Sequence, residues 1–373
     1  PMYVAAKAME RPGKPCLGRL LRIVFCICLL ISTSTGGNMF QAWNVGELTQ
    51  EYFDVPSAAT GIVLAILVGL VIIGGIRRIG KVTATLVPFM VFLYLLAGSY
   101  VLATHVSEIP AMLGMIVKYA FVPTEAAGAF IGGTAGAAFM FGMKRAVFSN
   151  EAGQGSSPIA HAAAKTDEPV SEGVVALLEP FIDTLVICTM TGLVIVVTGA
   201  WQESSESMMG AALTAHAFSS SLGDAGAWVV GIGLTLFAFS TIIAWSYYGD
   251  RSAYFLFGER AVLPYRVCYT LLVVVGAAVP LQLVWNIADI TNILMALPNL
   301  VGLLLLSGVI ARGVREYFER EPVVKPLVEL QSVFARDPPD PAVVVMGDSA
   351  LDGRPRRRQE HGGDQSSAAD RKL

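Results

Sequence analysis

The stretch that decides the fold runs from Gly128 to Thr166 and reads GAFIGGTAGAAFMFGMKRAVFSNEAGQGSSPIAHAAAKT. Its first half is an apolar segment interrupted by glycines, and its second half is a dense polar loop. At membrane depth such a glycine-rich helix can unwind and direct its carbonyls and amides at a ligand. A simple membrane anchor has no use for the charged and amide side chains that follow. The stretch therefore predicts a transport site inside a membrane protein.

The composition of the whole chain supports a membrane location. Of the 373 residues, 54% are hydrophobic and 15% are charged, and the mean hydropathy is +0.61. A soluble domain of this length is less apolar. The basic residues lie in short clusters between apolar runs, so we expect no nucleic-acid binding. The five cysteines show no metal-binding spacing and are interpreted as small hydrophobic residues.

Hydropathy predicts a polytopic protein with eight transmembrane helices, because a helix needs roughly 20 apolar residues to cross the hydrocarbon core. Apolar runs of that length lie near residues 20–41, 59–76, 83–104, 126–143, 177–199, 227–248, 264–284 and 287–311. The loops alternate in charge, so the positive-inside rule places both termini of the chain in the cytoplasm. We expect the last two spans to be joined by a short polar turn around Trp285, Asn286 and Asp289.

The two ends of the chain differ from its middle. Residues 316–373 are rich in Pro, Asp and Arg and are expected to form a disordered cytoplasmic tail. Residues 1–315 are expected to form the transmembrane transporter domain. The first apolar run is too long for a signal peptide and follows a basic stretch after Pro1. We therefore expect that an N-terminal segment is missing.

Two acidic residues fall inside a predicted span, where a charge costs roughly 2.5–3.5 kcal/mol. Glu179 and Asp183 are four residues apart and thus share one helix face, with Pro180 in the first helical turn. Glu179 fits equally well as a cap at the membrane interface, where an acid favours the helix N-terminus. Asp183 lies one turn deeper and fits that interpretation less well.

Other polar side chains within the predicted spans also have two possible roles. Gln41 can donate to a carboxylate and accept from an ammonium group, but it could equally form an interhelical hydrogen bond. Ser240 and Thr241 present hard oxygen atoms that suit Na⁺, although such hydroxyls commonly bond back to a helix carbonyl. There is no GxSxG, HExxH, Walker lysine loop or Cys–His pairing, so we expect no enzyme and no cofactor.

Three segments together resemble the alanine or glycine:cation (sodium:alanine) symporter family: Lys144–Thr184, Gly37–Gln41 and the opening Pro1–Tyr3. The string SNEAGQGSSPIAHAAAKT is the most specific part, and the resemblance extends to about Arg315. It implies a five-plus-five inverted-repeat, leucine-transporter-like fold, with substrate and Na⁺ bound between two broken helices. The eight spans would be the third to tenth core helices, and residues 128–143 the broken helix of the second repeat.

The resemblance also implies roles for individual residues. Ser240 and Thr241 would supply oxygen ligands to a coupling ion, and no other metal site is expected. The substrate would be contacted by Gln41, by unwound backbone and by a side-chain pocket: Gly132, Gly133, Thr134, Gly136, Phe139 and Met140.

A gate is expected where the broken helix ends. Lys144, Arg145, Asn150 and Glu151 follow that helix directly. Positive-inside anchoring explains Lys144 and Arg145 equally well. It does not explain Asn150 and Glu151.

The expected function is Na⁺-coupled symport of alanine or glycine across the cell membrane. The sequence leaves open whether Na⁺ or H⁺ drives transport, which amino acid is preferred, and the oligomeric state. The resemblance places the first repeat's broken helix ahead of the Pro-Met-Tyr motif. We therefore expect the isolated chain not to transport by itself. The alternative is a non-transporting remnant or membrane interaction component.

Overall fold

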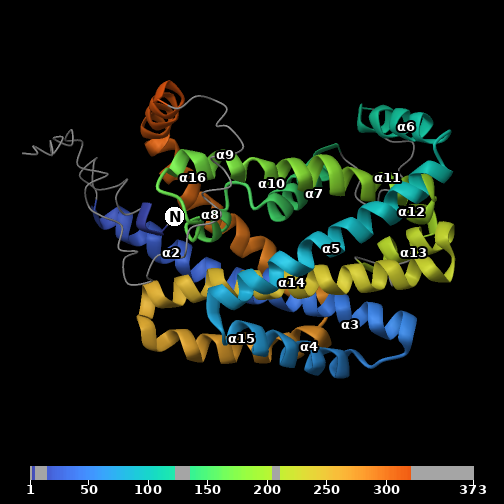
Figure 1. Cartoon of the computed structure of the whole chain (residues 1–373), viewed down its shortest axis with the longest axis horizontal. Coiled ribbons are helices and arrows are strands. Elements are labelled where there is room, and N and C mark those ends of the chain that lie inside the picture. The colour runs from blue at the N-terminus through green and yellow to red at the C-terminus, as the bar shows by residue number, and fades with distance from the viewer. Residues whose placement is uncertain (1, 5–14, 122–134, 204–210, 321–373) are drawn as a thin grey trace, which may run out of the picture. The chain divides into compact units, whose positions relative to one another are not determined.

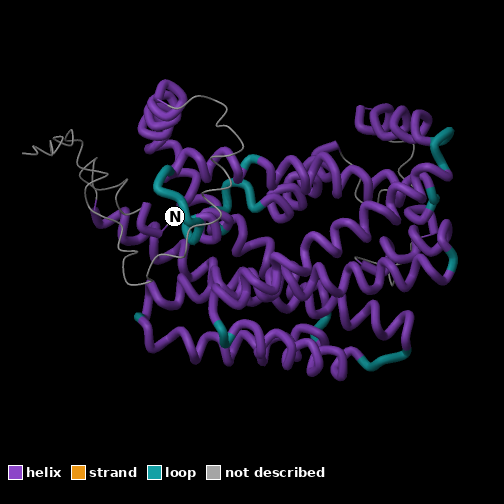
Figure 2. Tube along the Cα trace, viewed as in Figure 1, coloured by secondary structure: helices purple, strands orange, loops and turns teal. Residues whose placement is uncertain are grey.

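The computed structural model describes residues 2–4, 15–121, 135–203 and 211–320. Over these ranges the protein consists of helices joined by short loops, with no strand (Figure 1, Figure 2). The all-helical class predicted from hydropathy is confirmed. The chain divides into two units, Pro1–Tyr317 and Phe318–Leu373, and the helices that matter for function lie in the first.

The first half of the described chain contains α2 (Pro15–Ser34), the π-helix η1 (Thr35–Met39), α3 (Phe40–Phe53), α4 (Ser57–Ile72), α5 (Gly75–Thr104), α6 (Ile109–Phe121) and α7 (Ala135–Asn150). Next come α8 (Ser157–His161), α9 (Pro169–Ala176), α10 (Leu178–Pro180), the π-helix η2 (Phe181–Cys188), α11 (Thr189–Val197) and α12 (Ala200–Glu203). The last elements are α13 (Ala211–Leu222), α14 (Asp224–Phe257), the 3₁₀ turn η3 (Glu259–Ala261), α15 (Val262–Ala278) and α16 (Leu281–Arg320).

Among the described residues, six continuous helical stretches are long and apolar enough to cross a membrane: Cys16–Phe53, Gly75–Thr104, Pro169–Val197, Trp228–Phe257, Glu259–Ala278 and Leu281–Glu319. They correspond to six of the eight predicted spans. The predicted span at 59–76 corresponds to the shorter apolar helix Ser57–Ile72. The first half of the predicted span at 126–143 lies outside the described residues, which resume at Ala135 with α7.

The predicted turn between the last two spans is wrong by several residues. The break falls between α15 and α16, where Val279 is extended (φ −89°, ψ 145°) ahead of Pro280. Proline disfavours the helical conformation in the residue before it, which accounts for the end of α15 ahead of Pro280. Trp285, Asn286 and Asp289 consequently lie within α16 and are not part of the turn.

Helix α14 is central to the packing and contacts α2, α3, α5, α13 and α15 (Figure 1). It contributes to each of three buried apolar clusters: Ile242 and Ile243 to the first, Val230 to the second, and Trp245 and Tyr248 to the third. A helix with apolar contacts on all sides is typical of the interior of a bundle.

Helix α4 shows how the bundle meets its surroundings. Its inner face carries small or apolar residues that pack on α15, and a Cβ at Gly61 would lie 2.8 Å from the Ala277 side chain. Its outer face is equally apolar and exposed, with Ile66 at 59% and Leu70 at 61% exposure. Small residues at helix contacts and large apolar residues outside are the pattern of a helix in lipid.

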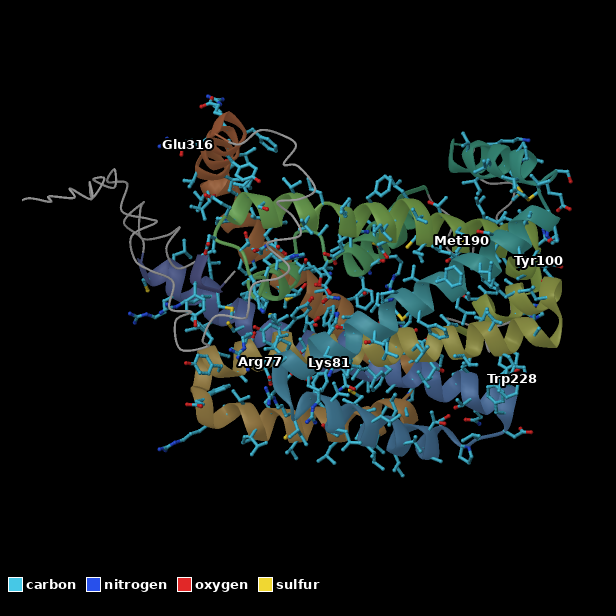
Figure 3. All side chains as sticks on the ribbon, in the orientation of Figure 1. Arg77, Lys81, Tyr100, Met190, Trp228 and Glu316 are labelled. Atoms are coloured by element: carbon cyan, nitrogen blue, oxygen red, sulfur yellow. The ribbon has the colours of Figure 1, made fainter. Side chains whose placement is uncertain are left out.

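The next helix, α5, has Arg77 and Lys81 at one end, and Tyr100 lies towards the other (Figure 3).

Candidate functional site

The first helical stretch, Cys16–Phe53, contains the π-helix η1, which reads Thr35-Gly36-Gly37-Asn38-Met39. Single-turn π-helices frequently mark functional sites. Both glycines are needed for close packing: a Cβ at Gly37 would lie 2.5 Å from the Trp245 ring of α14. A Cβ at Gly36 would lie 2.9 Å from the Phe148 ring of α7. The irregular turn is therefore pressed between two other helices.

Asn38 fixes the opposite side of η1 to α15. Its Nδ2 donates a hydrogen bond of 2.7 Å to the carbonyl oxygen of Tyr269, and the residue is fully buried. The Asn38 Oδ1 atom is buried and has no hydrogen-bond partner. Buried polar atoms are normally paired, so an unpaired amide oxygen suggests a place for a ligand or a water. The backbone of Met39 approaches so closely that a Cβ at Gly276 would lie 2.4 Å from the Met39 Cα.

An aromatic cluster lies next to η1 and joins four elements. Phe40 of α3 lies 4.3 Å from Trp285 of α16 and 6.0 Å from Phe148 of α7, measured between ring centroids. Phe148 lies 5.3 Å from Trp285 and 6.3 Å from Trp245 of α14. Gln41, the predicted substrate contact, follows Phe40 in α3 and is half-buried. Sequence reasoning missed this aromatic cluster, which begins one residue before the predicted substrate contact.

The predicted gate residues Lys144 and Arg145 both reach Asp289 of α16. The Arg145 guanidinium donates hydrogen bonds of 3.2 and 3.0 Å to the two carboxylate oxygens, and the Lys144 Nζ lies 3.6 Å from Oδ2. The guanidinium also lies over the Trp285 ring, 3.8 Å from its centroid. Both hydrogen bonds come from the same nitrogen, Nη2, so it is the stacking of the planar guanidinium on the ring that a lysine could not reproduce. The two basic residues thus join α7 to α16, which simple anchoring does not require.

The end of α7 is joined to η2 by a second polar contact. The Ser149 hydroxyl donates to Asp183 Oδ2 at 2.7 Å. The Asn150 amide donates to the Thr184 hydroxyl at 2.7 Å, and that hydroxyl donates to Asn150 Oδ1 at 3.0 Å. Asp183, an acidic residue inside an apolar helical stretch, therefore has a hydrogen-bond partner in α7.

The polar loop after α7 is held by α2 and α16. Gly155 has a φ of +88°, and a Cβ there would lie 2.7 Å from the Asn299 side chain and 3.0 Å from the Phe25 ring. The Asn299 amide donates to the Gly153 carbonyl at 2.9 Å. Gln154 is fully buried, and its amide donates to the Val147 carbonyl at 2.8 Å. The glycines of this loop thus serve close packing.

His161 of α8 lies between two carboxylates. His161 Nδ1 lies 2.7 Å from Glu172 Oε1, and its Nε2 lies 3.4 Å from Glu179 Oε2. Burial of the ring opposes the charged form, but the two carboxylates outweigh that effect and raise the pKa of His161. Glu179 also accepts a hydrogen bond of 3.1 Å from the Ser157 hydroxyl. Glu179 therefore has specific side-chain partners at the start of its span.

The predicted cation ligands lie mid-way along α14. Ser240 is buried, and its hydroxyl donates to the Phe237 carbonyl at 2.9 Å, as the alternative interpretation expected. Thr241 is half-buried beside it. A hydroxyl that donates to a helix carbonyl keeps its lone pairs available, so this bond is compatible with a cation ligand.

The remaining predicted substrate residues are not placed. Gly132, Gly133 and Thr134 lie outside the described residues; Gly136 and Phe139 lie in α7, but the surroundings of Gly136 and the side chain of Phe139 are not described. Met140 of α7 is 51% exposed.

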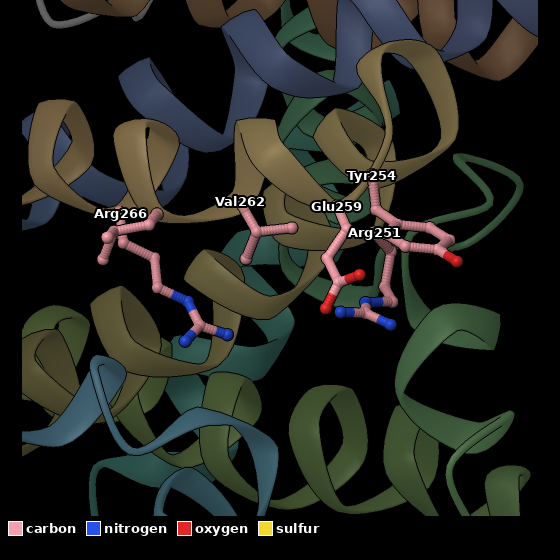
Figure 4. A pocket seen from close by; sticks show the side chains of 6 residues that line it. Arg251, Tyr254, Glu259, Val262 and Arg266 are labelled. Atoms are coloured by element: carbon pink, nitrogen blue, oxygen red, sulfur yellow. The ribbon is translucent and has the colours of Figure 1, made fainter. Parts of the chain in front are cut away.

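A charged pair that sequence reasoning missed joins α14 to α15. Asp250, almost fully buried, accepts hydrogen bonds from Arg266 Nε at 2.9 and 3.2 Å and a further one from Nη2. An open cavity of about 480 Å³ lies at this turn, lined by Arg251, Tyr254, Glu259, Val262, Leu263 and Arg266 (Figure 4). It contains none of the predicted site residues.

Asp289, Trp285 and Phe148 were missed because their partners are distant in sequence. Asp289 and Arg145 are 144 residues apart. An aspartate within an apolar run is a signal that could have identified Asp289. It was overlooked because Asp289 was assigned to the predicted turn and not to a span.

Comparison with known proteins agrees with this architecture. Residues 1–327 match the sequence profile of the sodium:alanine symporter family. The chain is 43% identical to the sodium/alanine symporter AgcS of Methanococcus maripaludis, over 86% of this chain and 69% of that protein. It is 43% identical to an uncharacterized transporter of Haemophilus influenzae, over 76% of this chain and 62% of that protein.

A more distant relative has a different substrate in its name. The chain is 31% identical to the probable sodium/glutamine symporter GlnT of Bacillus subtilis, over 90% of this chain and 67% of that protein. The chain thus spans about two thirds of the length of these relatives. The profile match and the identity to AgcS lead to the same conclusion: the chain belongs to the sodium:alanine symporter family.

Proposed function

We propose that this protein takes part in Na⁺-coupled symport of a small neutral amino acid, alanine or glycine, across the cell membrane. The observation that carries the proposal is the meeting of η1 with α7, α14 and α16. There the irregular turn with its unpaired Asn38 oxygen lies next to the aromatic cluster, and Gln41 follows Phe40 of that cluster in the chain. Family membership supplies the class of reaction.

The proposed substrate site combines backbone and aromatic surfaces. Gln41 would hold the zwitterion, and Phe40, Phe148 and Trp285 would wall the space beside it. Gly132, Gly133, Thr134 and Gly136 would supply unwound backbone, and Phe139 and Met140 the pocket for the side chain. Tight glycine packing under Trp245 leaves little room, which supports a small substrate.

The proposed coupling-ion site uses the oxygens of Ser240 and Thr241 on α14. Neutral hydroxyl oxygens suit Na⁺, and α14 is the helix that contacts η1, α2, α3 and α15. An ion bound there would act on the helix about which the others are packed. The gate would consist of Lys144 and Arg145 on Asp289, together with Asn150 and Glu151.

Uptake of radiolabelled alanine into proteoliposomes tests the proposal. The chain is reconstituted alone and as a fusion behind the first broken helix that the family resemblance expects. We expect uptake by the fusion that depends on an inward Na⁺ gradient and is competed by glycine. Uptake that is indifferent to Na⁺ would contradict Na⁺ coupling, and stronger competition by glutamine would contradict the small-substrate assignment.

Gln41→Ala tests the substrate site in the same assay. We expect a rise in the apparent substrate constant of roughly tenfold, as for loss of a hydrogen bond to a charged group. Gln282→Ala is the matched control, because Gln282 is exposed and bonds only to the neighbouring turn at Asn286 in the described structure. An unchanged constant for Gln41→Ala would remove Gln41 from the site.

A further inference from the structure

Glu151 lies in an unusual position where α7 gives way to the polar loop. Its φ is +52°, a left-handed conformation that non-glycine residues seldom adopt. The residue as a whole is only half-buried, yet its carboxylate Oε2 is buried and has no hydrogen-bond partner. An acidic group is thus buried in the protein although the rest of the residue is partly exposed.

The groups that face this carboxylate come from the loop itself and from α14. They are the Ser156 hydroxyl, the Tyr248 hydroxyl and the Trp245 indole. Ser156 is fully buried, and Trp245 and Tyr248 are 5% and 8% exposed. These neighbours are neutral, so they do not compensate a negative charge as an arginine would.

The charged groups around Glu151 make its ionisation harder. The charge that acts on it is that of Glu179, a second carboxylate. The basic residues that precede it, Lys144 and Arg145, are directed to Asp289. His161 is directed to Glu172 and Glu179.

These surroundings favour the protonated acid. Burial raises the pKa of Glu151 to about 7, the Glu179 charge adds to the rise, and the hydroxyls of Ser156 and Tyr248 and the Trp245 indole reduce it. A buried carboxylate without a cationic partner neutralises itself in this way. The side chain can therefore exchange a proton near neutral pH.

We propose that Glu151 is a proton-binding site, which holds a proton on its carboxylate while the loop 151–156 is packed against α14 and releases it to water when the loop moves away. The link to the transport cycle rests on the proposed function; proton binding itself does not. Trp245 provides that link, because the same indole covers Gly37 of η1 and faces Glu151. Trp245 is thus in contact with both the proton site and the proposed substrate region, so a change at one can affect the other.

Infrared difference spectroscopy of the purified full chain tests proton binding without any transport. The C=O stretch of a protonated carboxyl should disappear with a midpoint near pH 7 in the unaltered protein and be absent in Glu151→Gln. Glu172→Gln is the matched control and should retain the signal, because Glu172 bonds to His161. A midpoint near the ordinary value of 4.5, or a signal that survives in Glu151→Gln, would overturn the proposal.

Two further variants give opposite expected shifts and do not remove Glu151. Glu179→Gln removes the neighbouring negative charge and should lower the midpoint, whereas Tyr248→Phe removes a stabilising hydroxyl and should raise it. Midpoints that do not move in either variant would place the titrating group elsewhere. Loss of Na⁺-dependent uptake in the reconstituted fusion, with the infrared result intact, would count against the proposed function alone.

The stability of the protein provides a second measure. Because the folded state holds the proton more tightly than the unfolded chain, stability should fall as the pH rises from about 4.5 to about 7. Glu151→Gln should lose this part of the pH dependence. An identical fall in stability in Glu151→Gln would contradict the assignment.

Discussion

The two π-helical segments in the described part of the chain, η1 and η2, have the same backbone irregularity but opposite surroundings. In η1 four of the five residues are buried: Thr35, Gly36, Gly37 and Asn38. In η2 no residue is buried. The first is held by the close approach of other helices to its glycines. The second is held by hydrogen bonds of Asp183 and Thr184 to the end of α7.

This difference indicates that the two segments have different roles. Close packing is lost steeply when surfaces separate, whereas a few exposed hydrogen bonds can be exchanged for bonds to water at little cost. We infer that η1 keeps its shape through the transport cycle and that η2 and the end of α7 can separate. Four substitutions test that contrast.

The largest effect is expected from Gly37→Leu in η1. A side chain there would collide with Trp245, because even its Cβ would lie 2.5 Å from the ring. We expect a loss of about 3 kcal/mol in the free energy of unfolding, the upper range for overpacking. Gly192→Leu in α11 is the control, since nothing lies within 4 Å of a Cβ at that position. Unfolding in mixed micelles measures both, and equal losses would contradict a rigid η1.

A smaller loss is expected from Asn38→Ala, which removes the hydrogen bond to the Tyr269 carbonyl. The expected loss is about 2 kcal/mol, because a buried acceptor loses its donor. Asn286→Ala on the exposed face of α16 should change stability by less than about 0.5 kcal/mol. If the two variants behave alike in thermal unfolding, the tie between η1 and α15 is not stabilising.

Asp289→Asn tests whether the ion pair between α7 and α16 stabilises the protein. The carboxylate is 16% exposed and Arg145 is 35% exposed, so solvent weakens the pair and the expected loss is about 1 kcal/mol. The exchange of charges, Arg145→Asp with Asp289→Arg, should recover part of that loss. Failure of the double variant to recover any stability would show that the pairing contributes little.

The smallest stability effect is expected from Ser149→Ala, which removes the bond to Asp183 and should cost about 0.5 kcal/mol. Its main effect should be on access, because the Ser149 hydroxyl and Asp183 both contact the Cys188 sulfur. We expect faster alkylation of Cys188, with the exposed Cys268 as an internal control. An unchanged rate for Cys188 would mean that η2 is as firmly held as η1.

Hydropathy was sufficient to predict the helical class and the positions of six of the eight spans, because each apolar run is a local property of the chain. It failed at Pro280, where a single residue ends α15 inside a continuous apolar region. It also gave no sign of the π-helices, since their geometry depends on neighbours such as Trp245 that are distant in sequence.

The candidate site was predictable only in part. Gln41 and the gate residues could be selected because polar groups are rare in such a chain. Their partners could not be selected, because Asp289 and Thr184 reach α7 through packing of separate helices. The Ser240 hydroxyl shows the limit of residue type alone, since its bond to Phe237 fits two interpretations.

The buried pair of Asp250 and Arg266 has a consequence for biosynthesis. The ribosome makes Asp250 sixteen residues before the arginine that neutralises it, so a newly made α14 carries an unpaired acid near its end. An isolated charge resists entry into lipid. We therefore expect the insertion machinery to retain α14 until α15 has been synthesised, and to release the two helices into the bilayer together as a hairpin.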